Sequence, residues 1–142
     1  MHIGIPREIK NHEHRVALTP EGAHVLTDAG HRVSIESGAG ATSGFADETY
    51  RAAGANVVAT PAEAWAAELV VKVKEPQADE LKLLREGQLL FCYLHLAAAP
   101  DLARELMARG VTAIAYETVS KAGGGLPLLQ PMSDIAGRLA PQ

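Results

Sequence analysis

A histidine at position 95 lies inside an almost unbroken apolar run, LLFCYLHLAAAP, which spans residues 89–100. An imidazole changes charge near neutral pH, so His95 is a candidate general acid and base. The alternative is a core histidine whose ring nitrogens hydrogen-bond to the backbone, because buried polar groups need partners. The apolar run alone does not decide between these two interpretations.

Two basic side chains follow β-rich runs, as His95 does. Arg15 comes after HIGIP (residues 2–6) in a polar segment, and Lys74 closes ELVVKVK (68–74). Parallel strands share one edge at their carboxyl ends, and ligands of open α/β sheets bind beyond that edge. We therefore expect Arg15, Lys74 and His95 to converge there. A core histidine has no reason to share an edge with two cations, so this placement favours a functional His95.

The elements that must position these residues alternate between strand and helix patterns. This order predicts an α/β fold with a doubly wound, mostly parallel sheet flanked by helices, either Rossmann-like or flavodoxin-like. Several runs are continuously apolar, as expected for strands covered on both faces. The six predicted strands are HIGIP (2–6), RVSIE (32–36), ANVVA (55–59), ELVVKVK (68–74), QLLFCYL (88–94) and VTAIAYE (111–117), the last ending in Tyr116 and Glu117.

Capping residues mark the helices between the strands. Thr19 followed by Pro20 begins the first helix and Gly30 ends it. Thr60 and Glu63 have the spacing of a capping box. A later helix, PDLARELMARG (100–110), is expected to place Leu102, Leu106 and Met107 on one face.

One motif suggests a nucleotide-binding loop, and another suggests a solvated strand end. GAGATSG (38–44) resembles the dinucleotide fingerprint G-x-G-x-x-G, but its third glycine comes one residue late, so a tight glycine loop is the better interpretation. VKVK (71–74) could be solvated at a strand end. It nevertheless places Lys72 and Lys74 on one face of an otherwise buried strand, where an unpaired ammonium would be costly.

Composition limits the classes of function. The 142 residues carry a net charge of -4, with 47% hydrophobic and 21% charged residues, which is typical of one globular domain. The negative charge disfavours nucleic acid and anionic membranes as partners. No apolar run reaches the about 18 residues of a membrane span, and no secretory signal is evident. A single cysteine, Cys92, is expected to be a buried, inert thiol of a reducing cytoplasm, and we expect no metal site.

The sequence resembles the alanine dehydrogenase family in five blocks. These blocks occur in the family's order and spacing over essentially all 142 residues: IGIPREIKNHEHRVALTP, VVKVKEP, LLFCYLHLAA, TAIAYETV and LPLLQPMSDIAGRLA. The related proton-translocating nicotinamide nucleotide transhydrogenase shares the opening and the strand before EP but lacks the histidine of the YLHLAA block. His95 therefore favours the alanine dehydrogenase side of the family.

The resemblance implies roles for individual residues. Arg15 and Lys74 would hold the carboxylate and carbonyl oxygen of the substrate, and His95 would be the acid/base. Met132 and Ser133 would border the nicotinamide of NAD. Family members interconvert L-alanine with pyruvate and ammonia, as cytoplasmic homo-oligomers that are commonly hexamers.

The resemblance also implies that a large part of the family chain is missing. Family chains continue into an NAD-binding Rossmann domain with a catalytic aspartate, and then return to complete the first domain. We therefore expect residues 1–130 to form the substrate-binding domain and 131–142 to begin the connecting helix. NAD would bind mainly to the absent domain, and the segment alone would be inactive. The alternatives are a transhydrogenase-like subunit domain and a non-catalytic module for carboxylate binding or assembly.

Overall fold

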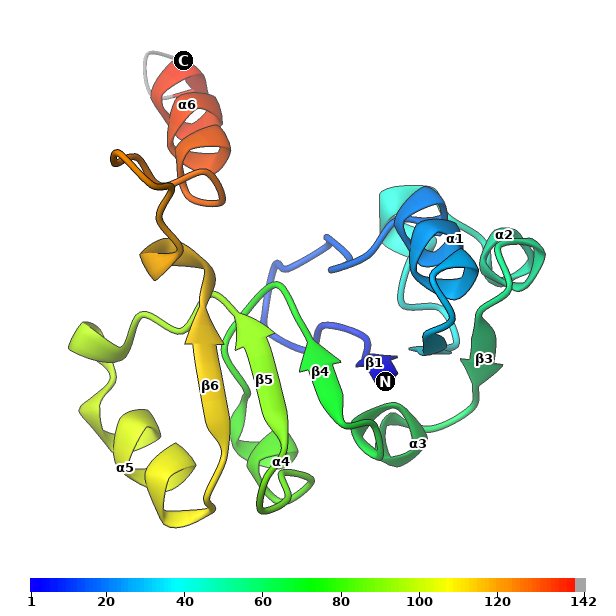
Figure 1. Ribbon diagram of the computed structural model, residues 1–142, viewed down its shortest axis with the longest axis horizontal. Coiled ribbons are helices and arrows are strands. Elements are labelled where there is room, and N and C mark those ends of the chain that lie inside the picture. The colour runs from blue at the N-terminus through cyan, green and yellow to red at the C-terminus, as the bar shows by residue number, and fades with distance from the viewer. Residues whose placement is uncertain (140–142) are drawn as a thin grey trace.

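The structure, a computed structural model, describes residues 1–139 and contains a six-stranded sheet in the order β3-β2-β1-β4-β5-β6 (Figure 1). All neighbouring strands pair in parallel. The strands are β1 (His2–Ile5), β2 (Arg32–Glu36), β3 (Asn56–Val58), β4 (Leu69–Val71), β5 (Leu89–Cys92) and β6 (Thr112–Ala115). The predicted doubly wound sheet is confirmed, fully parallel and in the Rossmann order.

Helices and single 3₁₀ turns connect the strands. The helices are α1 (Pro20–Asp28), α2 (Asp47–Ala52), α3 (Pro61–Trp65), α4 (Ala78–Leu81), α5 (Pro100–Ala108) and α6 (Gln130–Leu139). The 3₁₀ turns are η1 (Ala41–Ser43), η2 (Leu96–Ala98) and η3 (Tyr116–Thr118). No helix within residues 1–139 is long and apolar enough to cross a membrane.

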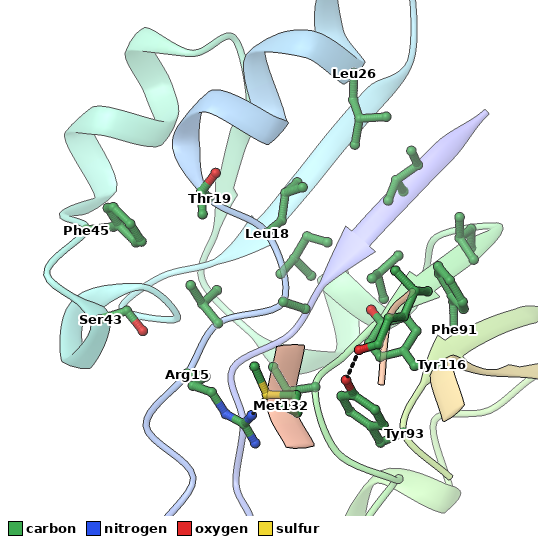
Figure 2. A pocket seen from close by; sticks show the side chains of 18 residues that line it. Arg15, Leu18, Thr19, Leu26, Ser43, Phe45, Phe91, Tyr93, Tyr116 and Met132 are labelled. Atoms are coloured by element: carbon green, nitrogen blue, oxygen red, sulfur yellow. Dashed lines mark hydrogen bonds between the residues drawn. The ribbon is translucent and has the colours of Figure 1, made fainter. Parts of the chain in front are cut away.

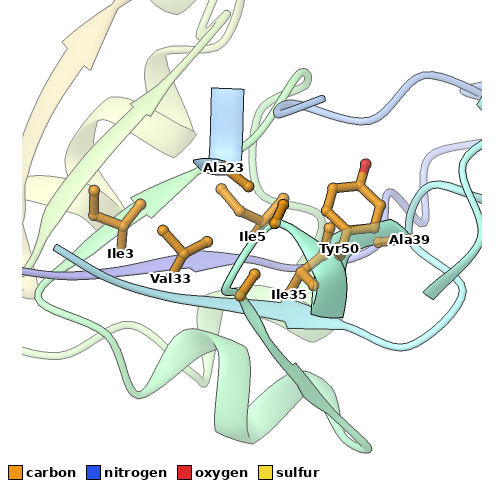
Figure 3. Packing of buried hydrophobic residues seen from close by; sticks show 9 residues of the cluster. Ile3, Ile5, Ala23, Val33, Ile35, Ala39 and Tyr50 are labelled. Atoms are coloured by element: carbon orange, nitrogen blue, oxygen red, sulfur yellow. The ribbon is translucent and has the colours of Figure 1, made fainter. Parts of the chain in front are cut away.

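Side chains alternate between the two faces of the sheet and form two cores. On one face, Ile5 and Ile35 pack with Ala23 of α1 and Tyr50 of α2 (Figure 3). On the other face, the second core combines Trp65 of α3, Val70, Leu90 and Leu106 of α5. Gly4 faces α3 so closely that a Cβ there would lie 1.9 Å from the Ala64 carbonyl oxygen. The central strand therefore needs glycine at this position.

The first face is covered unevenly. Helices α1 and α2 pack over β2 and β3, whereas Leu69, Val71 and Phe91 of β4 and β5 line an open cleft. Ile114 of β6 is 45% exposed. The β4–β6 half of this apolar face is therefore open in the described chain.

The predicted caps are present, and one predicted helix face is wrong. Thr19 accepts a hydrogen bond from the Gly22 N–H, and Thr60 and Glu63 form the capping box at the start of α3. In α5, Leu106 is buried but Met107 is 79% exposed. Met107 lies one position, about 100°, around the helix from Leu106, which places it outside the buried stripe.

Helix α6 stands beyond the carboxyl ends of β4, β5 and β6 (Figure 1). It covers most of the segment 131–142 that the sequence predicted to be helical, and residues 140–142 lie outside the described residues. Two contacts tie this part of the chain to the sheet edge: Tyr93 donates to the Leu128 carbonyl, and Arg15 contacts Met132.

Candidate active site at the carboxyl edge of the sheet

The sheet reverses its strand order between β1 and β4, and a cleft of about 640 Å³ lies over these strands. Such a switch point is where open α/β sheets bind ligands. Arg15 follows β1 and Lys74 follows β4, so the chain places both cations after the two strands that flank the switch point. Arg15, Tyr93 and Met132 line the cleft beside the apolar side chains of the sheet (Figure 2).

Glu13 holds Arg15 in place. The Arg15 side chain donates from Nε to Glu13 Oε1 at 2.8 Å and from Nη2 to Oε2 at 2.6 Å. Hydrogen bonds from Arg15 lower the pKa of Glu13 from 4.5 to about 2, and the pKa of Arg15 is raised in return. Nη1 points instead to Met132 Sδ, 2.9 Å away. Nη1 thus contacts no carboxylate of residues 1–139, and both Arg15 and Met132 line the cleft.

The glycine loop at residues 38–44 supports the same segment. The hydroxyls of Thr42 and Ser43 donate to the His14 carbonyl oxygen at 2.8 and 2.9 Å, one residue before Arg15. A Cβ at Gly40 would lie 2.8 Å from both the Phe45 carbonyl oxygen and the ring of Tyr50. The glycines therefore serve a tight loop that positions the backbone beside Arg15.

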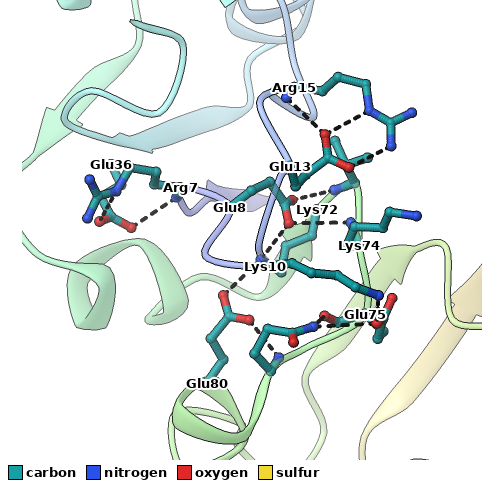
Figure 4. Close-up of polar contacts among 12 residues, drawn as sticks. Arg7, Glu8, Lys10, Glu13, Arg15, Glu36, Lys72, Lys74, Glu75 and Glu80 are labelled. Carbon is teal, nitrogen blue, oxygen red and sulfur yellow. Dashed lines mark hydrogen bonds and ion pairs between the residues drawn. The ribbon is translucent and has the colours of Figure 1, made fainter. Parts of the chain in front are cut away.

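Lys72 is the centre of a buried ion cluster (Figure 4). Its ammonium donates to Glu8 Oε2 at 3.1 Å and to Glu80 Oε1 at 2.8 Å, and its side chain is 0% exposed. Burial raises the pKa of Glu8, and the Lys72 charge opposes that rise. The Lys72 ammonium, for which the sequence analysis named no partner, is thus neutralised by Glu8, 64 positions away in the chain, and by Glu80, eight positions away.

Lys74, two residues on, has a different environment. Its backbone N–H and that of Val73 donate to the Glu8 carboxylate at 3.4 and 2.6 Å, which fixes the loop after β4. The half-buried ammonium of Lys74 makes no hydrogen bond or ion pair with any residue of 1–139. After the hydrogen bonds from Arg15, the Lys74 charge also helps to lower the pKa of Glu13, so Lys74 is within electrostatic reach of the Glu13–Arg15 pair.

His95 is exposed in the described chain and belongs to neither of its two cores. Its backbone is left-handed, with φ 51° and ψ 39°. The imidazole lies nearly parallel to the ring of Tyr93, with 10° between the planes and 6.0 Å between the centroids. Tyr93 lines the cleft, whereas His95 lines a neighbouring hollow of about 360 Å³ together with Glu117.

The structure thus groups most of the predicted residues around Tyr93 and the cleft. Met132 contacts Arg15, while Ser133 is exposed on α6 and is not among the residues that line the cleft. Glu8 and Glu13 lie in the polar segment that follows the first strand, and Glu117 ends the sixth predicted strand, but the sequence indicated no partner for any of them. For Glu13, its position two residues before Arg15 was the available signal.

The strand order and the charged switch point place the protein in the class of doubly wound α/β domains with a cleft at the carboxyl edge of the sheet. The chain belongs to the family described as alanine dehydrogenase/PNT, N-terminal domain, whose model matches residues 4–136.

Individual relatives agree with this assignment. The chain is 58% identical to an alanine dehydrogenase of Bacillus subtilis (strain 168) and 54% identical to one of Halomonas elongata, over 100% of this chain and 37% and 38% of theirs. A solved L-alanine dehydrogenase superposes with a TM-score of 0.95 at 57% identity, over 98% of this chain and 38% of its own. A transhydrogenase from Sinorhizobium meliloti gives 0.80 at 29% identity, over 86% and 36%. The chain spans a little over a third of these relatives.

Proposed function

We propose that this chain is the substrate-binding and acid/base part of an NAD-dependent L-alanine dehydrogenase, which interconverts L-alanine with pyruvate and ammonia. The observation that carries the proposal is the pair of cations after β1 and β4, the two strands that flank the switch point. Arg15 lines the apolar cleft, and Lys74, which does not line it, is within electrostatic reach of the Glu13–Arg15 pair. The identity of 58% to an alanine dehydrogenase, against 29% to a transhydrogenase, supports this over the transhydrogenase-like alternative.

The two cations suit a small 2-oxo acid. Arg15 keeps Nη1 at the cleft while Glu13 holds the other edge of the guanidinium, so the group is preorganised for an incoming carboxylate. Lys74 offers a compact charge that no residue of 1–139 pairs with, and such a charge suits a carbonyl oxygen. A methyl group on the substrate matches the apolar wall of the cleft.

His95 is proposed to move the protons of the reaction. Water adds to iminopyruvate to give a carbinolamine, and the imidazole accepts the proton that this water loses. The imidazolium then protonates the amine. As ammonia leaves, the imidazole accepts the proton of the carbinolamine hydroxyl, and pyruvate forms. An exposed imidazole beside the cleft-lining Tyr93 is free to exchange protons in both directions.

The cofactor fits this chain only in part. When bound, NAD would supply the hydride acceptor for the α-carbon of alanine, and Met132, which lines the cleft, is the residue proposed to border the nicotinamide. Ser133 is proposed beside it on α6. The turn after β1 carries charged residues in place of the glycines that let a backbone approach a pyrophosphate. NAD is therefore proposed to bind mainly to a further domain. The open β4–β6 face of the sheet is proposed to be covered by another part of the enzyme.

Because family members are commonly cytoplasmic hexamers, we also propose that the enzyme is cytoplasmic and forms a homo-oligomer, most commonly a hexamer in the family. The competing candidate from another class is a non-catalytic carboxylate-binding module. The exposed His95 beside the cleft favours catalysis over that module.

The test is a fusion enzyme, in which residues 1–142 are joined to the remainder of the Bacillus subtilis alanine dehydrogenase. We expect it to oxidise NADH only when pyruvate and ammonia are both present, and the 142-residue chain alone to show neither turnover nor micromolar NADH binding by calorimetry. A folded fusion enzyme that binds NADH but has no activity would contradict the proposal. Micromolar NADH binding by the chain alone would show that the cofactor site is misplaced.

A further inference from the structure

We propose that Glu117 is a positioning residue that sets the backbone of His95 and thereby aims its imidazole. The inference rests on the proposed acid/base function of His95 and extends it to a residue on the neighbouring strand. Glu117 acts through backbone hydrogen bonds and need not touch the substrate.

The contacts of Glu117 are directed at two consecutive backbone groups. The N–H of His95 donates to Glu117 Oε1 at 2.6 Å, and the N–H of Leu94 donates to Oε1 and Oε2 at 3.1 and 3.3 Å. Successive N–H groups that converge on one anion form a nest, and hydrogen bonds to an ionised carboxylate are the strong kind. Both oxygens of Glu117 are thus used to hold the backbone at residues 94 and 95.

The sheet register places these groups opposite each other. Cys92 of β5 pairs with Ala115 of β6, so Leu94 and Glu117 each lie two residues beyond a paired position. The 3₁₀ turn η3 carries Glu117, and within it the hydroxyl of Thr118 donates back to the Ala115 carbonyl at 3.0 Å. The carboxylate is therefore presented by a turn fixed to the end of β6, so the contact does not depend on a free loop.

The backbone of His95 needs such support. A non-glycine residue at φ 51° occupies a sparsely populated, left-handed conformation, which persists only when its surroundings determine it. The Glu117 carboxylate holds the N–H side of the residue, while the His95 carbonyl accepts from the Ala98 N–H at 2.9 Å in η2. With both sides fixed, the Cα–Cβ bond has one direction, and the imidazole lies parallel to the ring of Tyr93.

The test is a double-mutant cycle in the fusion enzyme. Glu117→Ala should lower kcat by at least about tenfold, because misplacing a catalytic group by about 1 Å can cost a hundredfold. The KM for pyruvate, which depends on Arg15 and Lys74, should change less than twofold. Glu117→Gln keeps a neutral acceptor and should fall between wild type and Glu117→Ala. In a His95→Ala background, Glu117→Ala should cause no further loss.

The same cycle separates the two proposals. If His95→Ala leaves kcat unchanged, the proposed function fails. If His95→Ala lowers kcat but Glu117→Ala does not, only the positioning role fails. Equal losses from Glu117→Ala with and without His95 would show a merely structural residue and also overturn the inference. Glu48→Ala, an exposed glutamate of α2, is the matched control and should leave kcat and KM unchanged.

A second measurement uses the 142-residue chain itself and does not depend on activity. Nuclear magnetic resonance should show slow exchange of the Leu94 and His95 amides, and backbone chemical shifts that place His95 in the left-handed region. In Glu117→Ala both amides should exchange at least about tenfold faster, and His95 should leave that region, while the amides of β1 and β4 keep their protection. Unchanged exchange and shifts at residues 94 and 95 would overturn the proposal.

Discussion

Replacing Lys72 with methionine removes the cation from a cluster that holds two carboxylates out of water. The side chains of Lys72, Glu8 and Glu80 are 0%, 3% and 5% exposed, so neither carboxylate is screened when the ammonium is lost. Breaking a buried ion pair in this way costs about 3–5 kcal/mol, a large part of the about 5–15 kcal/mol that stabilises a domain. At roughly 3–4 °C per kcal/mol for a chain of this size, we expect Tm to fall by about 10–20 °C.

Urea unfolding of the 142-residue chain, followed by circular dichroism at pH 7, measures this loss. Lys82→Met is the matched control, because the Lys82 side chain is 69% exposed and its partner Asp79 is 86% exposed. The control should change the free energy of unfolding by less than about 1 kcal/mol. Restoring neutrality with Glu8→Gln and Glu80→Gln in the Lys72→Met background should recover most of the loss.

The pH dependence has a definite sign. Without Lys72, the folded-state pKa of Glu8 lies further above its unfolded value, so the penalty is complete at high pH and shrinks as pH falls through the folded pKa. A loss for Lys72→Met no larger than that for Lys82→Met, or one that does not change between pH 7 and pH 5, would refute the reasoning.

Two further predictions concern the substrate cations. Because Arg15 lowers the pKa of Glu13 from 4.5 to about 2, the pair stabilises the fold above the unfolded pKa and this contribution is lost as pH falls toward 2. The Arg15 side chain is 44% exposed, so solvent screening reduces this contribution to roughly 1–2 kcal/mol. In urea unfolding, Glu13→Gln should therefore destabilise the chain at pH 7 and much less at pH 3. An equal loss of stability at the two pH values would contradict this prediction. In the fusion enzyme, Arg15→Ala and Lys74→Ala should each raise the KM for pyruvate at least about tenfold, with little change in NADH affinity by fluorescence titration. Unchanged pyruvate KM in both variants would return them to the role of surface charges.

The strand and helix positions could be predicted because the signals are local. Runs rich in β-forming residues marked all six strands, and Thr19 and Thr60 marked helix starts through hydrogen bonds to residues three positions away. The predicted strands were too long at the carboxyl ends, where β4 ends at Val71 and β5 at Cys92. Val73 continues the alternating pattern past β4, and Tyr93 and Leu94 continue the apolar run past β5, so periodicity alone could not place these two ends.

The contacts of Glu8 with Lys72 and of Glu117 with His95 could not be predicted, because they join distant parts of the chain. Glu8 is 64 positions from Lys72 in the sequence, and Glu117 is 22 from His95. These contacts depend on which strands are neighbours and on their register, and a single sequence with six strands leaves that order open. Once the order β1-β4-β5-β6 is known, Leu94 and Glu117 each lie two residues beyond a paired position, and Glu8 and Lys72 follow the neighbouring strands β1 and β4.

The measurement that tests the account most directly is kcat for His95→Ala in the fusion enzyme, with His24→Ala as the control. His24 lies on α1 with a side chain that is 62% exposed, so it matches His95 in chemistry but not in place. Loss of a positioned acid/base should lower kcat by about 10²–10⁴-fold, with NADH affinity unchanged and His24→Ala as active as wild type. A kcat for His95→Ala within about twofold of wild type would contradict the account, because the proton transfers would then take place without His95.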